Sequence, residues 1–214
     1  MFFIEKIWYL SLNLKVKMKR RFKVITTTSN HKLPISPNHL NRDFYSNTID
    51  KVYVGDITYI PTNEGWLYLA IVIDIYSRKV VGWSMNHSLH TSLVNDALVM
   101  AIKRREPSKG LIYHTDRGSQ YASYEHKNLL NKYGIIQSMS KKGDCWDNAV
   151  AESFFGSLKQ ERVHWRNYET RYGAQQDVLN YITMWYNSYR LHSYLDYHSP
   201  NNFELMNVDL KMVA

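Results

Sequence analysis

The chain has 214 residues, of which 44% are hydrophobic and 14% aromatic, so it can form a packed core and is not a disordered polypeptide. Its single cysteine, Cys145, excludes an intrachain disulfide and a cysteine-rich zinc site. Glu5 and Lys6 interrupt the only apolar run near the N-terminus. We therefore expect neither a signal peptide nor a membrane-spanning helix.

Positive charge is concentrated near the N-terminus. The formal net charge is +8, and residues 1–50 contain nine Lys or Arg against three Asp or Glu. Six of these cations form a cluster without an intervening acid: Lys15, Lys17, Lys19, Arg20, Arg21 and Lys23. This cluster is either a solvated basic arm or a patch that contacts nucleic-acid phosphates without reading the sequence.

In the first half of the chain, the residue pattern predicts a linker followed by strands. Residues 24–50 are rich in Thr, Ser, Asn and Pro and are expected to be extended. Aromatic and β-branched residues then predict three strands, over Val52–Ile60, Trp66–Tyr76 and Lys79–Met85. The short turns between them, including Ser77-Arg78, indicate an antiparallel meander.

The second half alternates between helices and strands. Thr91 is expected to cap a helix whose apolar residues, from Leu93 to Ile102, are spaced for one helical face. The further predicted elements are a strand at Leu111–His114, a helix at Tyr124–Tyr133 ended by Gly134, a strand at Ile135–Met139, a helix capped by Asp147 or Asn148 and running through Gln160, and a long aromatic helix from Thr170 to about Leu191.

This order, β-β-β-α-β-α-β-α, predicts an α/β fold with a mixed five-stranded sheet and helices on both faces. The last two strands follow helical crossovers and should run parallel to their neighbours. Ribonuclease H-like folds have this topology. We expect residues 1–50 to be a basic arm and linker, 51–165 the ribonuclease H-like core, and 166–214 a C-terminal helical extension.

Three acidic residues stand where a ligand site is expected. Asp56 interrupts the first strand, Asp116 ends the fourth, and Glu152 lies one turn into the helix that follows Asn148. Ligands gather at the carboxyl ends of strands in such sheets, and three carboxylates suit Mg²⁺ or Mn²⁺. Taken singly, however, a strand-end Asp is more often a cap, and a helix Glu more often faces solvent. Asp74 is interpreted as bonded to the Ser77-Arg78 turn.

The spacing and the neighbouring residues indicate a family. Thirty-five residues separate Asp116 from Glu152, and Asp56 precedes Asp116 by 60 positions. The segments V-G-D-I-T-Y-I, H-T-D-R-G-S-Q-Y-A-S, D-N-A-V-A-E-S-F-F-G-S-L-K-Q-E and Y-N-S-Y-R-L-H-S-Y-L occur in this order. From about Lys15 to Phe203, the chain resembles the integrase-core half of bacterial insertion-sequence-three family transposases, which share the D, D-35-E pattern of retroviral integrases. It departs from the family at Tyr53 and Gly55, usually Trp and Thr, and at Asp196, usually Gly.

The resemblance implies a function. Asp56, Asp116 and Glu152 would be the catalytic residues and would bind two Mg²⁺ or Mn²⁺ ions. A metal-activated water would cut the end of a DNA element, and the freed 3′-hydroxyl would attack target DNA. The implied partners are element-end and target DNA, further copies of the chain on DNA, and the product of an upstream reading frame. The implied location is the nucleoid of a bacterial cytoplasm.

Family members usually carry a helical DNA-binding region before the basic segment, and only some fourteen residues precede Lys15 here. A shortened copy is therefore expected. Two rival interpretations stay open. The chain could be a truncated, inactive DNA-binding remnant that modulates a full-length transposase, or it could be a plain ribonuclease H-like nuclease. DNA cleavage in Mn²⁺ separates an active enzyme from a remnant.

Several further residues carry open interpretations. Lys159 lies two helical turns after Glu152, so it either contacts a DNA phosphate or is a solvated helix lysine. Asn187, Arg190 and His192 match the family pattern Y-N-x-x-R-x-H, and His192 is either a DNA contact or a buried histidine. The neighbouring Trp185 and Tyr186 are expected to pack in the core rather than to stack on bases.

Overall fold

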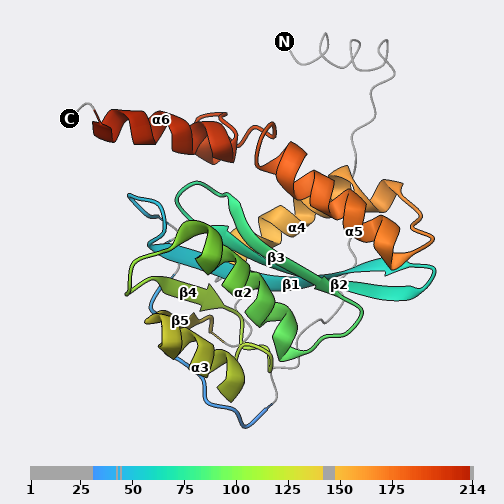
Figure 1. Cartoon of the computed structure of the whole chain (residues 1–214), viewed down its shortest axis with the longest axis horizontal. Helices are drawn as coiled ribbons and strands as arrows, with labels where there is room; N and C mark the ends of the chain where they lie inside the picture. The colour runs from blue at the N-terminus through green and yellow to red at the C-terminus, as the bar shows by residue number, and fades with distance from the viewer. Residues whose placement is uncertain (1–30, 42, 44, 142–147, 213–214) are drawn as a thin grey trace, which may run out of the picture.

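The computed structural model describes residues 31–41, 43, 45–141 and 148–212, with side chains described up to residue 207. A mixed five-stranded sheet forms its centre, in the order β3-β2-β1-β4-β5 (Figure 1). Its strands are β1 (Val52–Thr62), β2 (Gly65–Asp74), β3 (Val80–Asn86), β4 (Ile112–Thr115) and β5 (Ile136–Met139). The first three strands are antiparallel, and β4 runs parallel to both β1 and β5. The predicted mixed sheet is confirmed.

Helices cover both faces of the sheet (Figure 1). One apolar cluster joins the sheet to α2 (Thr91–Arg105) and α3 (Tyr124–Tyr133), and a second joins it to α4 (Ala149–Glu161) and α5 (Arg171–Asn180). The central strand β2 is covered on both faces because its side chains alternate between the two clusters. This double coverage explains why its sequence is an almost continuous apolar run.

The linker lies along the edge strand β5. The amide of Met139 donates to the carbonyl of Pro37, and the amide of His39 donates to the Ser138 hydroxyl. Leu40 is buried in the core. The described part of the linker contains bends and turns but no helix or strand, and it covers part of an edge whose backbone groups would otherwise be exposed.

The helix ends differ from the sequence prediction at the start of α2. Thr91 is the first helical residue and not the N-cap. His90 occupies the N-cap position with an extended backbone, and its side chain forms no capping bond. At α4, Asn148 occupies the N-cap position without such a bond, and Asp147 lies outside the described residues. The predicted end of α3 is confirmed, since Gly134 adopts φ 66°, a left-handed conformation that favours glycine.

The predicted long helix to Leu191 is wrong in its second half. Thr170 caps α5 through a hydrogen bond from Gly173, as expected, but α5 ends at Asn180. A π-helix, Tyr181–Tyr186, follows it, and the amide of Asn187 donates to the carbonyl of Ile182 five residues earlier. The wider turn lets Tyr181, Ile182 and Tyr186 all be buried in one core cluster.

The remaining elements lie near the C-terminal end of the chain. They are two single-turn 3₁₀ helices, Val163–Trp165 and Ser193–Leu195, and α6 (Pro200–Met212), which extends from the body of the molecule (Figure 1). The sequence prediction missed α6. Buried polar contacts fix its first turns, since Glu204 bonds to Ser77, Lys79 and Arg105.

Candidate active site

Two of the three predicted acids lie at corresponding positions of neighbouring parallel strands, Asp56 within β1 and Asp116 directly after the end of β4. Val54 of β1 is paired with His114 of β4, and Asp56 and Asp116 each follow two residues later. Side chains two residues apart point to the same face of a strand. Val54 belongs to the cluster that contains α4, so Asp56 faces the α4 side of the sheet.

Backbone amides orient both carboxylates. Asp56 Oδ1 accepts a hydrogen bond from the amide of Ile57 at 2.7 Å, and Asp116 Oδ1 accepts one from the amide of Gly118 at 2.8 Å. The second bond closes the turn after β4, which explains why a buried strand can end on an aspartate.

The third predicted acid, Glu152, belongs to the first turn of α4, which contacts β1. Its side chain is exposed, in contrast to the partly buried Asp56 and Asp116. Within the described ranges, no group of three or more His, Cys, Asp and Glu side chains is arranged to hold a metal ion. The convergence of all three carboxylates on common metal ions therefore stays a prediction.

The electrostatics of Asp56 link the three acids. Burial raises the pKa of Asp56 well above its usual range, and the charges of Asp116 and Glu152 raise it further. The Ile57 amide and the Lys159 ammonium act in the opposite direction. Negative charge is thus concentrated on hard oxygen atoms that Mg²⁺ and Mn²⁺ prefer, and the residues present fit such a cation.

A tyrosine lies beneath the acids in the space that a side chain at position 55 would occupy. A Cβ atom on Gly55 would lie 2.0 Å from the Tyr113 hydroxyl oxygen, so this strand position requires glycine. Tyr113 is fully buried and packs edge-on against Tyr121, with ring centroids 6.3 Å apart. Sequence analysis missed this packing, although a glycine inside a strand is a signal of close approach by another group.

Lys159 lies on the same side of the sheet as Asp56. Its ammonium is 4.8 Å from the ring centroid of Tyr59. Burial lowers the pKa of Lys159, while the charge of Asp56 opposes that change. Its role as a phosphate contact stays a prediction. The basic cluster Lys15, Lys17, Lys19, Arg20, Arg21 and Lys23 lies outside the described residues.

The Y-N-x-x-R-x-H residues have different structural roles. The buried side chain of Asn187 bonds to both backbone groups of Val80 and so ties this segment to β3. Arg190 forms an ion pair with Glu161 at 2.8 Å. His192 packs edge-on against Tyr186, with centroids 4.8 Å apart. Tyr186 is buried, as predicted, but Trp185 is exposed, so the prediction that it packs in the core is wrong.

Comparison with known sequences establishes the family. Two models described as integrase core domain match residues 48–145 and 152–208, so the first includes Asp56 and Asp116 and the second begins at Glu152. The transposase for insertion sequence element IS904 of Lactococcus lactis is 47% identical over 171 residues, which are 80% of this chain and 68% of that protein. Transposase InsF for insertion sequence IS3A of Escherichia coli is 45% identical over 195 residues, 91% of this chain and 67% of that protein. The chain belongs to the IS3 family of transposases.

Solved structures establish the fold of this transposase-family chain. The catalytic core domain of BIV integrase superposes with a TM-score of 0.56 at 17% identity and covers 76% of this chain and 99% of that one. The HTLV-2 integrase catalytic core domain in complex with magnesium gives a TM-score of 0.58 at 16% identity, with coverages of 74% and 99%. The predicted ribonuclease H-like fold is confirmed. Among the helices described, none is long and apolar enough to cross a membrane.

Proposed function

We propose that this chain catalyses metal-dependent cleavage and strand transfer of DNA, with Asp56, Asp116 and Glu152 as its catalytic residues. One observation carries the proposal. Two aspartates stand at equivalent positions of adjacent parallel strands, and the charge of a glutamate on α4 acts on the same carboxylate, in a chain of a transposase family.

Asp56, Asp116 and Glu152 would hold two Mg²⁺ or Mn²⁺ ions, which activate the attacking oxygen and neutralise the leaving oxygen of a phosphodiester when bound. The protein's own contribution is orientation. The amides of Ile57 and Gly118 each fix one oxygen of an aspartate and so orient its carboxylate. These bonds hold the two aspartates in place at no cost of reorganisation during the reaction.

Cations of the chain would position the DNA. Lys159 lies near Asp56 and would contact a phosphate of the strand being cut. The cluster Lys15, Lys17, Lys19, Arg20, Arg21 and Lys23 would add sequence-independent affinity for the DNA backbone. We further propose that several copies assemble on DNA ends, that the product of an upstream reading frame participates, and that the protein works at the bacterial nucleoid.

The test is an assay of DNA cleavage and strand transfer in Mg²⁺ or Mn²⁺, with labelled duplexes whose ends carry free 3′-hydroxyls. The parent chain should convert these duplexes, and Asp116→Asn should lower the rate by at least about 10³-fold, or about 4 kcal/mol. Asp74→Asn is the matched control, because it removes a buried aspartate outside the site, and it should retain activity.

Equal cleavage by the parent and Asp116→Asn would identify a contaminating nuclease and contradict the proposal. DNA binding by the parent without any metal-dependent conversion would instead support the interpretation as an inactive, DNA-binding remnant.

A further inference from the structure

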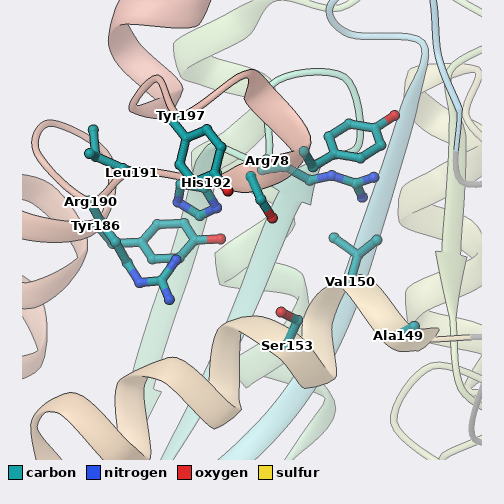
Figure 2. A pocket seen from close by; sticks show the side chains of 11 residues that line it. Arg78, Ala149, Val150, Ser153, Tyr186, Arg190, Leu191, His192 and Tyr197 are labelled. Atoms are coloured by element: carbon teal, nitrogen blue, oxygen red, sulfur yellow. The ribbon is translucent and has the colours of Figure 1, made fainter. Parts of the chain in front are cut away.

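A pocket of about 570 Å³ lies beside the first turns of α4, which carry Glu152. Val150 and Ser153 of α4 point toward it from one side (Figure 2). The segment that follows the π-helix, from Tyr186 to Tyr197, forms much of the rest of its wall, and Arg78 from the β2–β3 turn completes it. The pocket is distinct from the carboxylate site but shares a helix with it.

Positive charge dominates this pocket. Arg78 and Arg190 both line it, and no acidic residue does so among those that the structure describes. The Arg78 guanidinium lies over the ring of Tyr194, 3.8 Å from its centroid. Arg190 is held by Glu161, outside the lining, through its Nε atom. Guanidinium groups bind phosphate through several hydrogen bonds at once, so an anionic ligand is favoured here.

An exposed aromatic residue stands at the rim in a strained backbone conformation. Tyr197 is 69% exposed and has φ 59°, in the left-handed region that bulky residues rarely adopt. Asp196 before it is also left-handed, at φ 49°, which explains why glycine is usual at that position of the family. Backbone bonds hold the turn, since the Tyr197 amide donates to the His192 carbonyl at 2.9 Å. Strain of this kind clusters at ligand sites.

The pocket also offers hydroxyl groups beside its cations and its aromatic face. Ser153 and Ser193 line it, and a hydroxyl can donate to or accept from a sugar or a base. The cations, the hydroxyls and the aromatic face match the phosphate, sugar and base of a nucleotide.

We propose that this pocket binds one unpaired nucleotide of the DNA strand held at the carboxylates, with its phosphate on Arg78 and its base stacked on Tyr197. The inference rests on the proposed function, since it takes DNA as the substrate. A base inside a duplex is stacked on both sides and cannot enter a pocket, so the nucleotide must be unpaired. The shared helix α4 makes the pocket a site for a frayed or single-stranded end next to the cut.

Equilibrium binding of the full chain to two DNA ligands tests the proposal. One ligand is a blunt duplex, and the other is the same duplex with three unpaired nucleotides at one 5′ end. Ca²⁺ replaces Mg²⁺ so that no strand is cut. The parent should prefer the overhang by at least about tenfold, or about 1.4 kcal/mol, since an unpaired base can stack on Tyr197. Tyr197→Ala and Arg78→Gln should abolish the preference without weakening binding of the blunt duplex.

Tyr172→Ala is the matched control, because Tyr172 is equally exposed, at 70%, but lies on α5 outside the pocket lining. It should keep the preference. Thermal unfolding shows whether each variant is folded. If Arg78→Gln fails to fold, Tyr197→Ala still tests the proposal. Equal affinity of the parent for both duplexes, together with Asp116-dependent cleavage, would overturn the pocket proposal and leave the proposed function intact. Absence of any DNA binding or cleavage would overturn both.

Discussion

Two sets of acidic residues on this fold have different charged neighbours. Asp50, Asp74 and Glu204 surround the guanidinium of Arg105, and Lys79 adds a second cation. At the candidate active site, the main charges acting on Asp56 are those of two further carboxylates. Burial would raise the pKa of Glu204, but the bonds from Arg105 and Lys79 hold it below its usual range, whereas the pKa of Asp56 is raised.

The charged neighbours distinguish the structural network around Arg105 from the proposed reactive site around Asp56. The Arg105 network obtains its cations from the chain itself and uses them to attach α6 to the sheet. The Asp56 site concentrates negative charge that a cation from solution can neutralise, and perturbed pKa values of this kind cluster at functional sites. Removing Glu204, which contacts both cations, should therefore lower the stability, whereas removing an acid beside Asp56 should not.

The largest loss of stability is expected at the network. Glu204→Ala leaves Arg105 and Lys79 without their shared carboxylate in a largely buried setting, so the free energy of unfolding should fall by about 3 kcal/mol. Chemical denaturation measures this change. The exposed Glu169 is the control, and Glu169→Ala should lie within about 0.5 kcal/mol of the parent. An equal, small effect of both substitutions would remove the contrast between the two groups of acids.

The second prediction concerns pH. Three carboxylates face two cations in the network, and Asp74 is the fully buried acid. Burial raises the pKa of Asp74 to about 7, although two backbone amides and Arg105 act against the increase. A raised carboxyl pKa means that the native state binds more protons than the unfolded state between about pH 4 and pH 7. The stability that Asp74 contributes is therefore lost as the pH rises through that range.

Asp74→Asn imitates the protonated acid and should remove this pH dependence. Relative to the parent, the variant should gain on the order of 2–4 kcal/mol of stability between pH 4 and pH 8. Urea denaturation at several pH values measures the difference. If the difference in stability between Asp74→Asn and the parent were the same at every pH from 4 to 8, Arg105 would be keeping Asp74 ionised throughout.

The smallest expected change in stability is at the candidate active site. Asp116→Asn removes one of the charges that raise the pKa of Asp56, so in the absence of metal the variant should be as stable as the parent or more stable by up to about 1 kcal/mol. Thermal unfolding in the presence of a chelator gives this comparison. A loss of more than 1 kcal/mol would indicate that Asp116 is mainly a structural turn residue, through its bond to Gly118.

The sequence predicted the sheet well because its strands have strong local signals. Continuous apolar residues in β2 and helical spacing in α2 each indicate one kind of element. The prediction for the second half of the aromatic helix was wrong. A π-helix and an α-helix differ in how their turns pack, and amino-acid composition does not distinguish them. The helix α6 was missed because contacts from Ser77, Lys79 and Arg105, 99 to 127 residues away, fix its position.

The candidate site was predictable to a similar extent. The positions of Asp56 and Asp116 follow from strand order and register, which the sequence indicates. Asp74 was interpreted as a turn acid, and one of its oxygens does accept from Tyr76 at 2.9 Å, but the other bonds to the amide of Asp50. The packing of Tyr113 against Gly55 and the pocket beside α4 depend on distant segments meeting, and no local pattern reveals such contacts.

The central claim is that Asp56, Asp116 and Glu152 form one divalent-metal site, and Mn²⁺ binding tests it most directly. Calorimetric titration at pH 7.5 should detect Mn²⁺ binding to the parent, and Asp116→Asn should weaken it by at least about tenfold, or 1.4 kcal/mol. Asp56→Asn and Glu152→Gln should do the same, and Asp74→Asn should bind as the parent does. Unchanged Mn²⁺ affinity in Asp116→Asn, Asp56→Asn and Glu152→Gln would contradict the account.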